Sequence, residues 1–378
     1  MEKIRLYFID NLRILLITLV IMVHLSITYG GEGSWYYKEG RADEVSAIVL
    51  TVHNAVIQSF FMGFLFMISG YFTPGSYDRK GTGRFLNDRL LRLGIPILCY
   101  DFIVGPLIVR PLIHFSTQQY SGSYFDFLVG YYTSFHIGTG PLWFSEALLI
   151  FAGFYILWRR LSKAPIQAVQ NDSRMPGKVT ITAFALILGV VSFIVRIWLP
   201  IGWAFGPLNL QFPFFPQYIG LFIIGIIAYR RNWLVCIPDA MGKFWLFIAI
   251  IFVVVGFPVL FMLGGAPDNV PLFLGGLNWQ CFAYALWEQF TSLAIIIAML
   301  FLFRKWFNRQ ARVSKVMSAG SYTAYIIHAP VIILVSILMR NIDLYPLLKF
   351  ALALLISVPL CFALANFIRQ LPLARRIL

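Results

Sequence analysis

Arg13 and His24 are two ionisable residues inside the first hydrophobic stretch of the chain, and ten residues separate them in RILLITLVIMVH. Eleven steps of about 100° complete roughly three helical turns, so both side chains are predicted to share one face. They lie roughly 16 Å apart along the axis, about half the hydrocarbon thickness of a bilayer. A titratable side chain that faces lipid costs roughly 3 kcal/mol, so something polar must meet this face.

Two further candidates lie in later apolar stretches. Glu146 follows the opening of PLWFSEALLIF, and a carboxylate at that depth needs a partner or a proton. His328 in SYTAYIIHAP shares one helical face with Ser321 and Tyr325, just before Pro330, which weakens a helix. His328 either lines a cavity or makes a hydrogen bond between helices, and the sequence leaves both interpretations open.

Arg89 and Arg92 stand three residues apart in NDRLLRLGIPIL, just before Pro96. Two guanidinium groups on one face would bind a phosphorylated ligand. Alternatively, they are ordinary members of a basic cytoplasmic loop.

Other polar residues have simpler explanations. His53 is expected to make a structural hydrogen bond, and Arg110, Arg196 and Arg340 are expected to extend their side chains to the outer interface. Aromatic clusters such as GSWYY are typical of an outer interfacial belt, although the same rings would also stack on sugars.

The composition indicates the fold class that positions these residues. Hydrophobic residues make up 60% of the 378 positions, charged residues only 12%, and the mean hydropathy is +0.79. A soluble domain carries about 25% charged residues. The sequence therefore predicts an all-α, polytopic membrane helix bundle in the lipid bilayer, forming a single integral membrane domain over residues 1–378.

Apolar windows of about 20 residues occur ten times, which predicts about ten transmembrane helices. They cover residues 6–29, 46–73, 93–113, 141–158, 179–200, 214–229, 244–263, 280–303, 321–340 and 347–369.

The basic residues are distributed unevenly between alternate connections. One side holds 23 of the 30 Lys and Arg residues, so the positive-inside rule places both the N- and C-termini in the cytoplasm. The net charge of +14 is thus explained without a nucleic-acid partner. The four cysteines have no metal-ligand spacing, and no metal site is predicted.

Five segments together resemble the acyltransferase-3 family of integral membrane acyltransferases. In order they are FIDNLR with His24, FFMGFLFMISGYF, RLLRLGIP, PLWFSEALL and SYTAYIIHAP. The resemblance covers positions 8 to about 330, and the FID-x-LR opening is most similar to the branch of glucan succinyltransferases.

The resemblance implies a membrane-embedded O-acyltransferase in the cell (cytoplasmic) membrane, the bacterial inner membrane. Such enzymes take an acyl group from cytoplasmic acyl-CoA, here acetyl-CoA or succinyl-CoA, and deliver it to a carbohydrate or glycan acceptor outside. It assigns the Arg-x10-His pair essential for transfer to Arg13 and His24, and the R-x-x-R element to Arg89 and Arg92.

Within that resemblance, His24 is expected to act as a general base, or as a nucleophile that forms an acyl-imidazole. Arg13 is expected to bind the CoA arm, with Asp10 on the adjacent face fixing its guanidinium. Glu146 and His328 would orient His24 or the acceptor hydroxyl.

Two different classes of function also fit the residues. A secondary transporter would use intramembrane Arg, His and Glu as a substrate or proton path. A structural membrane subunit would use them only to join helices. We expect no soluble appended domain, because the chain ends about ten residues after its last span. A separate periplasmic or extracellular acyl-transfer partner would therefore be another protein.

Overall fold

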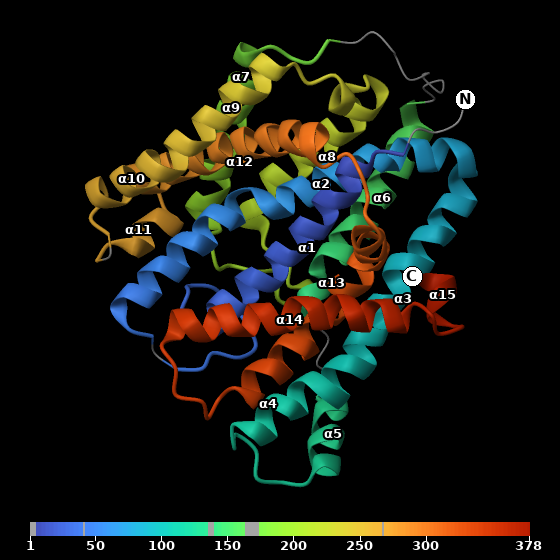
Figure 1. Ribbon diagram of the computed structural model, residues 1–378, viewed down its shortest axis with the longest axis vertical. Helices are drawn as coiled ribbons and strands as arrows, with labels where there is room; N and C mark the ends of the chain where they lie inside the picture. The colour runs from blue at the N-terminus through green and yellow to red at the C-terminus, as the bar shows by residue number, and fades with distance from the viewer. Residues whose placement is uncertain (1–4, 41, 135–139, 163–173, 267) are drawn as a thin grey trace.

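The computed structural model describes residues 5–40, 42–134, 140–162, 174–266 and 268–378, which form a bundle of helices (Figure 1). The all-α prediction is confirmed. The α-helices are α1 Tyr7–Thr28, α2 Glu44–Arg89, α3 Ile95–Cys99, α4 Arg110–Ser116, α5 Tyr124–Thr133, α6 Trp143–Ser162, α7 Lys178–Trp198, α8 Phe215–Arg230, α9 Asp239–Ile251, α10 Phe257–Leu263, α11 Val270–Leu274, α12 Trp279–Trp306, α13 Arg312–Leu338, α14 Pro346–Ile368 and α15 Ala374–Ile377. Short π-helices are η1 Leu90–Gly94, η2 Tyr100–Val109 and η7 Phe252–Gly256, and 3-10 turns are η3 Gly140–Leu142, η4 Gly206–Leu208, η5 Phe212–Phe214 and η6 Trp233–Val235.

Within the described ranges, nine helical stretches are long and apolar enough to cross a membrane. One of them, Glu44–Ser116, has 73 residues and contains two of the predicted windows, 46–73 and 93–113. At 1.5 Å per residue it is roughly 110 Å long, far more than one crossing of about 30 Å. Gly81, at φ 69° and ψ 173°, interrupts the helix, and Figure 1 shows the chain changing direction between α2 and α3. Ten predicted spans therefore correspond to nine helical stretches, because two of the spans lie within Glu44–Ser116.

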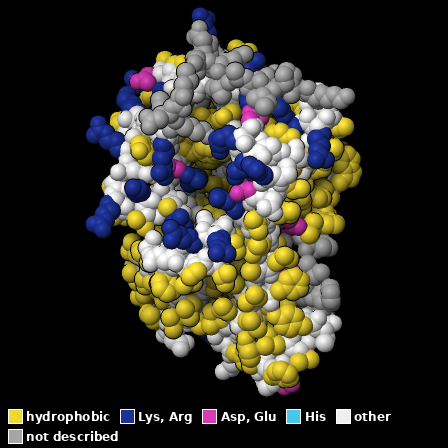
Figure 2. Space-filling model, turned by 90° about the vertical axis from the view of Figure 1, so that its right-hand side faces the viewer, with side chains coloured by type: hydrophobic (Ala, Val, Ile, Leu, Met, Phe, Trp, Pro, Cys, Tyr) yellow, Lys and Arg dark blue, Asp and Glu magenta, His cyan; other side chains and the backbone are white. Residues whose placement is uncertain are grey.

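Basic side chains gather on the side of the bundle where α1 begins and α15 ends. Figure 2 draws the bundle from the right-hand side of Figure 1. Lys and Arg are concentrated on the upper part of this view, and hydrophobic side chains lie below them. The gathering agrees with the uneven distribution of charge along the sequence. The cytoplasmic location of this side stays a prediction from the positive-inside rule.

Helices α1, α2, α12 and α13 form the centre of the bundle. α1 packs against the other three and α14, while α8 packs along α2. Glycines allow the last pair to approach closely: a Cβ on Gly70 would overlap the Phe222 carbonyl, and one on Gly225 would overlap that of Met67. Small residues at these two positions therefore let the α2 and α8 backbones meet.

Proline sets the shape of the π-helical segment between residues 90 and 111. In an α-helix a carbonyl accepts the N–H four residues later, and proline has none. Three carbonyl groups lie four residues before a proline, and each accepts a tyrosine hydroxyl. The pairs are Tyr322 to Arg92 at 2.8 Å, Tyr132 to Phe102 at 2.7 Å and Tyr124 to Leu107 at 2.9 Å, before Pro96, Pro106 and Pro111.

Arg196 does not extend to the outer interface, and that expectation is wrong. Its side chain is fully buried and donates a hydrogen bond of 2.5 Å to Glu288, so α7 and α12 are joined by an ion pair. Gln289 donates to the same carboxylate at 2.9 Å, and Gln217 on α8 donates to Gln289 at 3.0 Å. The sequence analysis missed this pair because its members lie 92 positions apart.

Removing one member of this pair should destabilise the fold. We expect Glu288→Ala to lower the free energy of unfolding by about 3–5 kcal/mol, because Arg196 would be left as an uncompensated buried charge. The comparison is Asp239→Asn, which breaks the exposed contact of 3.3 Å to Lys305 and should cost at most about 1 kcal/mol. Both are measured by thermal or denaturant unfolding in detergent. Equal stability of the two variants would show that the buried pair does not hold α7 to α12.

Candidate active site

The start of α1 is fixed by its own polar residues. The Asp10 carboxylate binds Arg13 through one oxygen and Arg5 through the other, the latter at 2.8 Å. The expected Asp10–Arg13 contact is confirmed. Asn11 donates to the carbonyls of Phe307 and Arg309 at 2.6 and 2.9 Å, which fastens α1 to the turn between α12 and α13. The FIDNLR segment therefore sets the position of α1 relative to α13.

His24 and His328 come together in the interior. Their ring centroids lie 5.0 Å apart with nearly parallel planes, although 304 positions separate them in the sequence. His24 is partly buried and His328 is fully buried. Counted from the first residues of α1 and α13, they lie roughly 26 and 24 Å along their helices. Two helices that begin at the basic side thus bring two imidazoles to the same depth.

Trp35 contacts both histidines. Its ring lies 3.8 Å from the His24 ring, centroid to centroid, and 5.9 Å from that of His328. From the sequence, Trp35 was expected in an interfacial aromatic belt. In the structure its ring instead lies against His24 and near His328. It lies in an irregular connection between α1 and α2, where no periodic pattern reports which way a side chain points.

Hydrogen bonding fixes the form of His328. Its Nδ1 contacts the backbone carbonyl of Tyr325, which can only accept, so Nδ1 carries the hydrogen and Nε2 keeps its lone pair. His328 Nε2 and His24 Nδ1 are both buried without a hydrogen-bond partner among the described residues. Unused imidazole nitrogens at this depth are available to a proton or a ligand.

Helix α13 connects this histidine pair to two other motif segments. Tyr325 donates to the Pro141 carbonyl at 2.6 Å, at the start of PLWFSEALL. Tyr322, one turn nearer the basic side, donates to the Arg92 carbonyl at 2.8 Å, and its oxygen lies 3.3 Å from the Ser145 hydroxyl. Tyr322 was missed by the sequence analysis. The signal was present, because Pro96 leaves the Arg92 carbonyl without its usual donor.

Arg89 and Arg92 lie at the junction of α2 and η1, with different surroundings. The Arg89 guanidinium lies over the Phe85 ring at 5.0 Å, and its Nε is buried without a hydrogen-bond partner among the described residues. Arg92 is exposed and its Nε lies 3.3 Å from the Asp88 carboxylate. Both guanidinium groups remain able to contact an anion at the basic face.

The predicted residues are not all gathered at one point. Arg13 is on the same continuous helix as His24, roughly 16 Å away along the axis. Glu146 is half-buried in the first turn of α6, next to Ser145. His53 lies elsewhere and contacts Asn54 at 3.1 Å, in line with the expected structural role.

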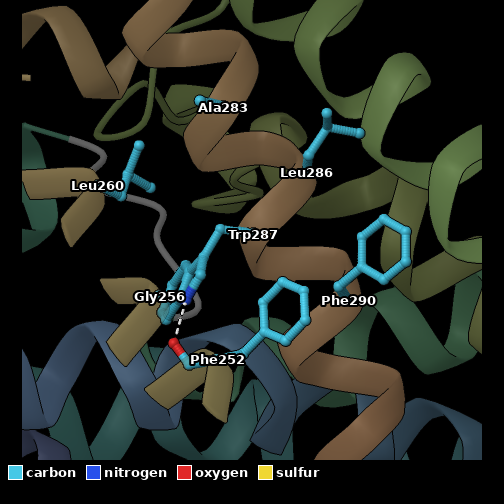
Figure 3. A pocket seen from close by; sticks show the side chains of 7 residues that line it. All are labelled: Phe252, Gly256, Leu260, Ala283, Leu286, Trp287 and Phe290. Carbon is cyan, nitrogen blue, oxygen red and sulfur yellow. Dashed lines mark hydrogen bonds between the residues drawn. The ribbon is translucent and has the colours of Figure 1, made fainter. Parts of the chain in front are cut away.

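A cavity of about 350 Å³ lies away from these residues, between η7, α10 and α12 (Figure 3). It is lined by Phe252, Gly256, Leu260, Ala283, Leu286, Trp287 and Phe290. The one hydrogen bond drawn there joins Trp287 to the Phe252 carbonyl at 2.8 Å. Its lining has no titratable group, so it is unsuited to acid–base chemistry.

Comparison with known proteins agrees with the motifs. The acyltransferase-3 model, described as an acyltransferase domain, matches residues 6–366. Glucans biosynthesis protein C of Escherichia coli (strain K12) is 35% identical over 94 residues, which is 25% of this chain and 23% of that protein. The Shigella dysenteriae serotype 1 (strain Sd197) protein of the same name is 25% identical over 234 residues, 60% of this chain and 58% of that protein.

The chain thus aligns with a quarter to just over half of the length of these curated relatives. No solved structure matches it. The family model, in contrast, covers nearly the whole bundle, including the histidine pair and both arginine elements. The chain belongs to the acyltransferase-3 family of membrane acyltransferases.

Proposed function

We propose that the protein transfers a small acyl group, acetyl or succinyl, from cytoplasmic acyl-CoA to a hydroxyl of an extracytoplasmic carbohydrate. The observation that carries this proposal is the contact of His24 with His328 deep in the bundle, with an unused nitrogen on each ring. The family match argues against the alternative of a secondary transporter. The relatives come from bacteria, so we place the chain in a bacterial cytoplasmic membrane.

The donor enters at the basic face. Arg89 and Arg92 hold the CoA phosphates there, because guanidinium groups bind phosphate oxygens with two donors each. The Tyr322 bond to the Arg92 carbonyl ties this entrance to α13, and six residues further along that helix is His328. Arg13 binds the pantetheine arm between the entrance and His24.

The reaction needs one base. His24 takes the proton of the acceptor hydroxyl while its oxygen attacks the thioester carbonyl. The carbon–sulfur bond then breaks, and the CoA thiolate leaves and receives the proton that His24 holds. His328 lies next to the His24 imidazolium that forms. The Nε2 lone pair of His328 accepts a hydrogen bond and thereby orients His24 or the acceptor hydroxyl. In the alternative sequence, His24 attacks the thioester carbonyl and the carbon–sulfur bond breaks, so that the CoA thiolate leaves and an acyl-imidazole forms. The acceptor hydroxyl then attacks the acyl carbon, and the imidazole of His24 leaves and takes up the hydroxyl proton.

Glu146 has a positioning role in this scheme, near the start of α6, where the Tyr325 hydroxyl contacts the Pro141 carbonyl. The relatives' name refers to glucans, so a glucan is the first acceptor to test.

Loss of the base should abolish transfer. We expect His24→Ala to lower the rate of acyl transfer by about 10²–10⁴-fold, because the hydroxyl would have no proton acceptor. The assay follows thioester loss from labelled acetyl- or succinyl-CoA by purified protein in the presence of glucan oligosaccharides. His53→Ala is the control and should retain wild-type activity. If the wild type binds no acyl-CoA and His24→Ala still supports flux of a solute, the acyltransferase proposal fails.

The two arginines should control the affinity for the donor. We expect Arg89→Gln and Arg92→Gln each to raise KM for acyl-CoA roughly tenfold, because each removes a charge-assisted contact to phosphate. High salt should weaken donor binding by the wild type more than by either variant. Arg84→Gln removes an exposed charge from α2, the helix that ends at Arg89, and should leave KM unchanged. An equal effect of all three substitutions would indicate only a general basic surface.

A further inference from the structure

A second, polar pocket lies where α1 ends and α14 begins. Its volume is about 140 Å³, and its lining includes Thr28, Tyr29, Glu39, Pro346 and Lys349. One water molecule occupies about 30 Å³ in the liquid, so the pocket has the volume of roughly five waters. It admits one small polar group or one ring, and no longer segment of a chain.

An ion pair stands in the wall of this pocket. Lys349 is almost fully buried, and its ammonium donates to one oxygen of Glu39 and to the Arg340 carbonyl at 3.3 Å. The second carboxylate oxygen, Oε2 of Glu39, is buried without a hydrogen-bond partner among the described residues. Burial raises the pKa of Glu39, and Lys349 opposes that rise. A buried acceptor without a donor is costly, which favours a ligand that supplies one.

The pocket lies close to the histidine pair. Thr28 is one helical turn beyond His24, about 6 Å along the axis, and its hydroxyl donates to the His24 carbonyl at 3.0 Å. The Glu39 N–H in turn donates to the Thr28 carbonyl at 2.9 Å. The same connection carries Trp35 onto His24 and Glu39 into the pocket. A ring held at Glu39 would therefore reach toward His24 from the side opposite the donor entrance.

The charges of the wall narrow the class of ligand. Glu39 disfavours an anion such as phosphate, and Lys349 disfavours a cation. A neutral group with adjacent hydroxyls suits both, because each hydroxyl can donate to the carboxylate and accept from the ammonium. We infer that this pocket binds one sugar unit of the acceptor, with Glu39 and Lys349 contacting neighbouring hydroxyls. This inference rests on the proposed function and adds to it a specific acceptor subsite.

A substitution that keeps the ion-pair contact but changes the free oxygen tests this subsite. In Glu39→Gln the amide oxygen can still accept from Lys349, whereas a donor replaces Oε2. With glucan oligosaccharides of four to six glucose units, α- and β-linked, as the probe, KM should rise roughly five- to tenfold with a smaller change in kcat. Glu32→Gln removes an exposed carboxylate from the same connection and should leave KM unchanged.

Calorimetric titration of the same oligosaccharides without acyl-CoA measures sugar binding alone. It therefore tests the sugar subsite separately from the proposed acyl transfer. Transfer by the wild type with an unchanged KM in Glu39→Gln would overturn the subsite and leave the acyltransferase proposal standing. A fall in thermal midpoint with equal losses of kcat for all substrates would also overturn it, because the pair would then only fasten the connection. Binding that weakens in Glu39→Gln without any acyl transfer would support the pocket and contradict the proposed function. Neither binding nor transfer would contradict both.

Discussion

The other helices pack around one interaction, the contact between His24 on α1 and His328 on α13. Two imidazoles deep in a bilayer are tolerated only where they meet other polar groups or each other. Asn11 fixes the start of α1 against the turn before α13, while Asp10 binds Arg13 within α1, so the two helices run side by side and the rings meet at equal depth. Helices α2, α12 and α14 pack against α1, and α14 also packs against α13.

Hydrogen bonds between tyrosine hydroxyls and carbonyls near prolines connect the histidine pair to the basic face. Pro96 cannot supply the N–H that the Arg92 carbonyl would receive in a regular helix, and Tyr322 of α13 supplies a hydroxyl in its place. Tyr325 of the same helix donates a hydrogen bond to the Pro141 carbonyl, at the start of the segment that leads into α6. The helix that carries His328 is thereby tied to the segment of Arg89 and Arg92. In the proposed reaction, these bonds fix the position of the donor entrance relative to the histidine pair.

Much of the fold can be predicted from hydrophobicity alone, because a membrane span must be a long apolar helix. The face shared by Arg13 and His24, and the contact of Asp10 with Arg13, follow from helical periodicity. The pairing of His24 with His328 does not, since periodicity within one helix carries no information on which helix packs against it. For the same reason Arg196 was misjudged, and its partner Glu288 went unnoticed. Trp35 lies in an irregular connection, where only the folded chain shows its direction.

The proposed route requires that a donor entering at Arg89 and Arg92 place its reacting carbon beside His24. A density map of the protein with a non-hydrolysable acyl-CoA analogue tests it most directly. The phosphates of the analogue should lie at the two arginines and its carbonyl carbon beside the His24 ring, with room for an acceptor oxygen about 3–3.5 Å from that carbon, as in a near-attack geometry. An analogue bound with its acyl group away from His24, or with its phosphates at any other face, would rule out this route.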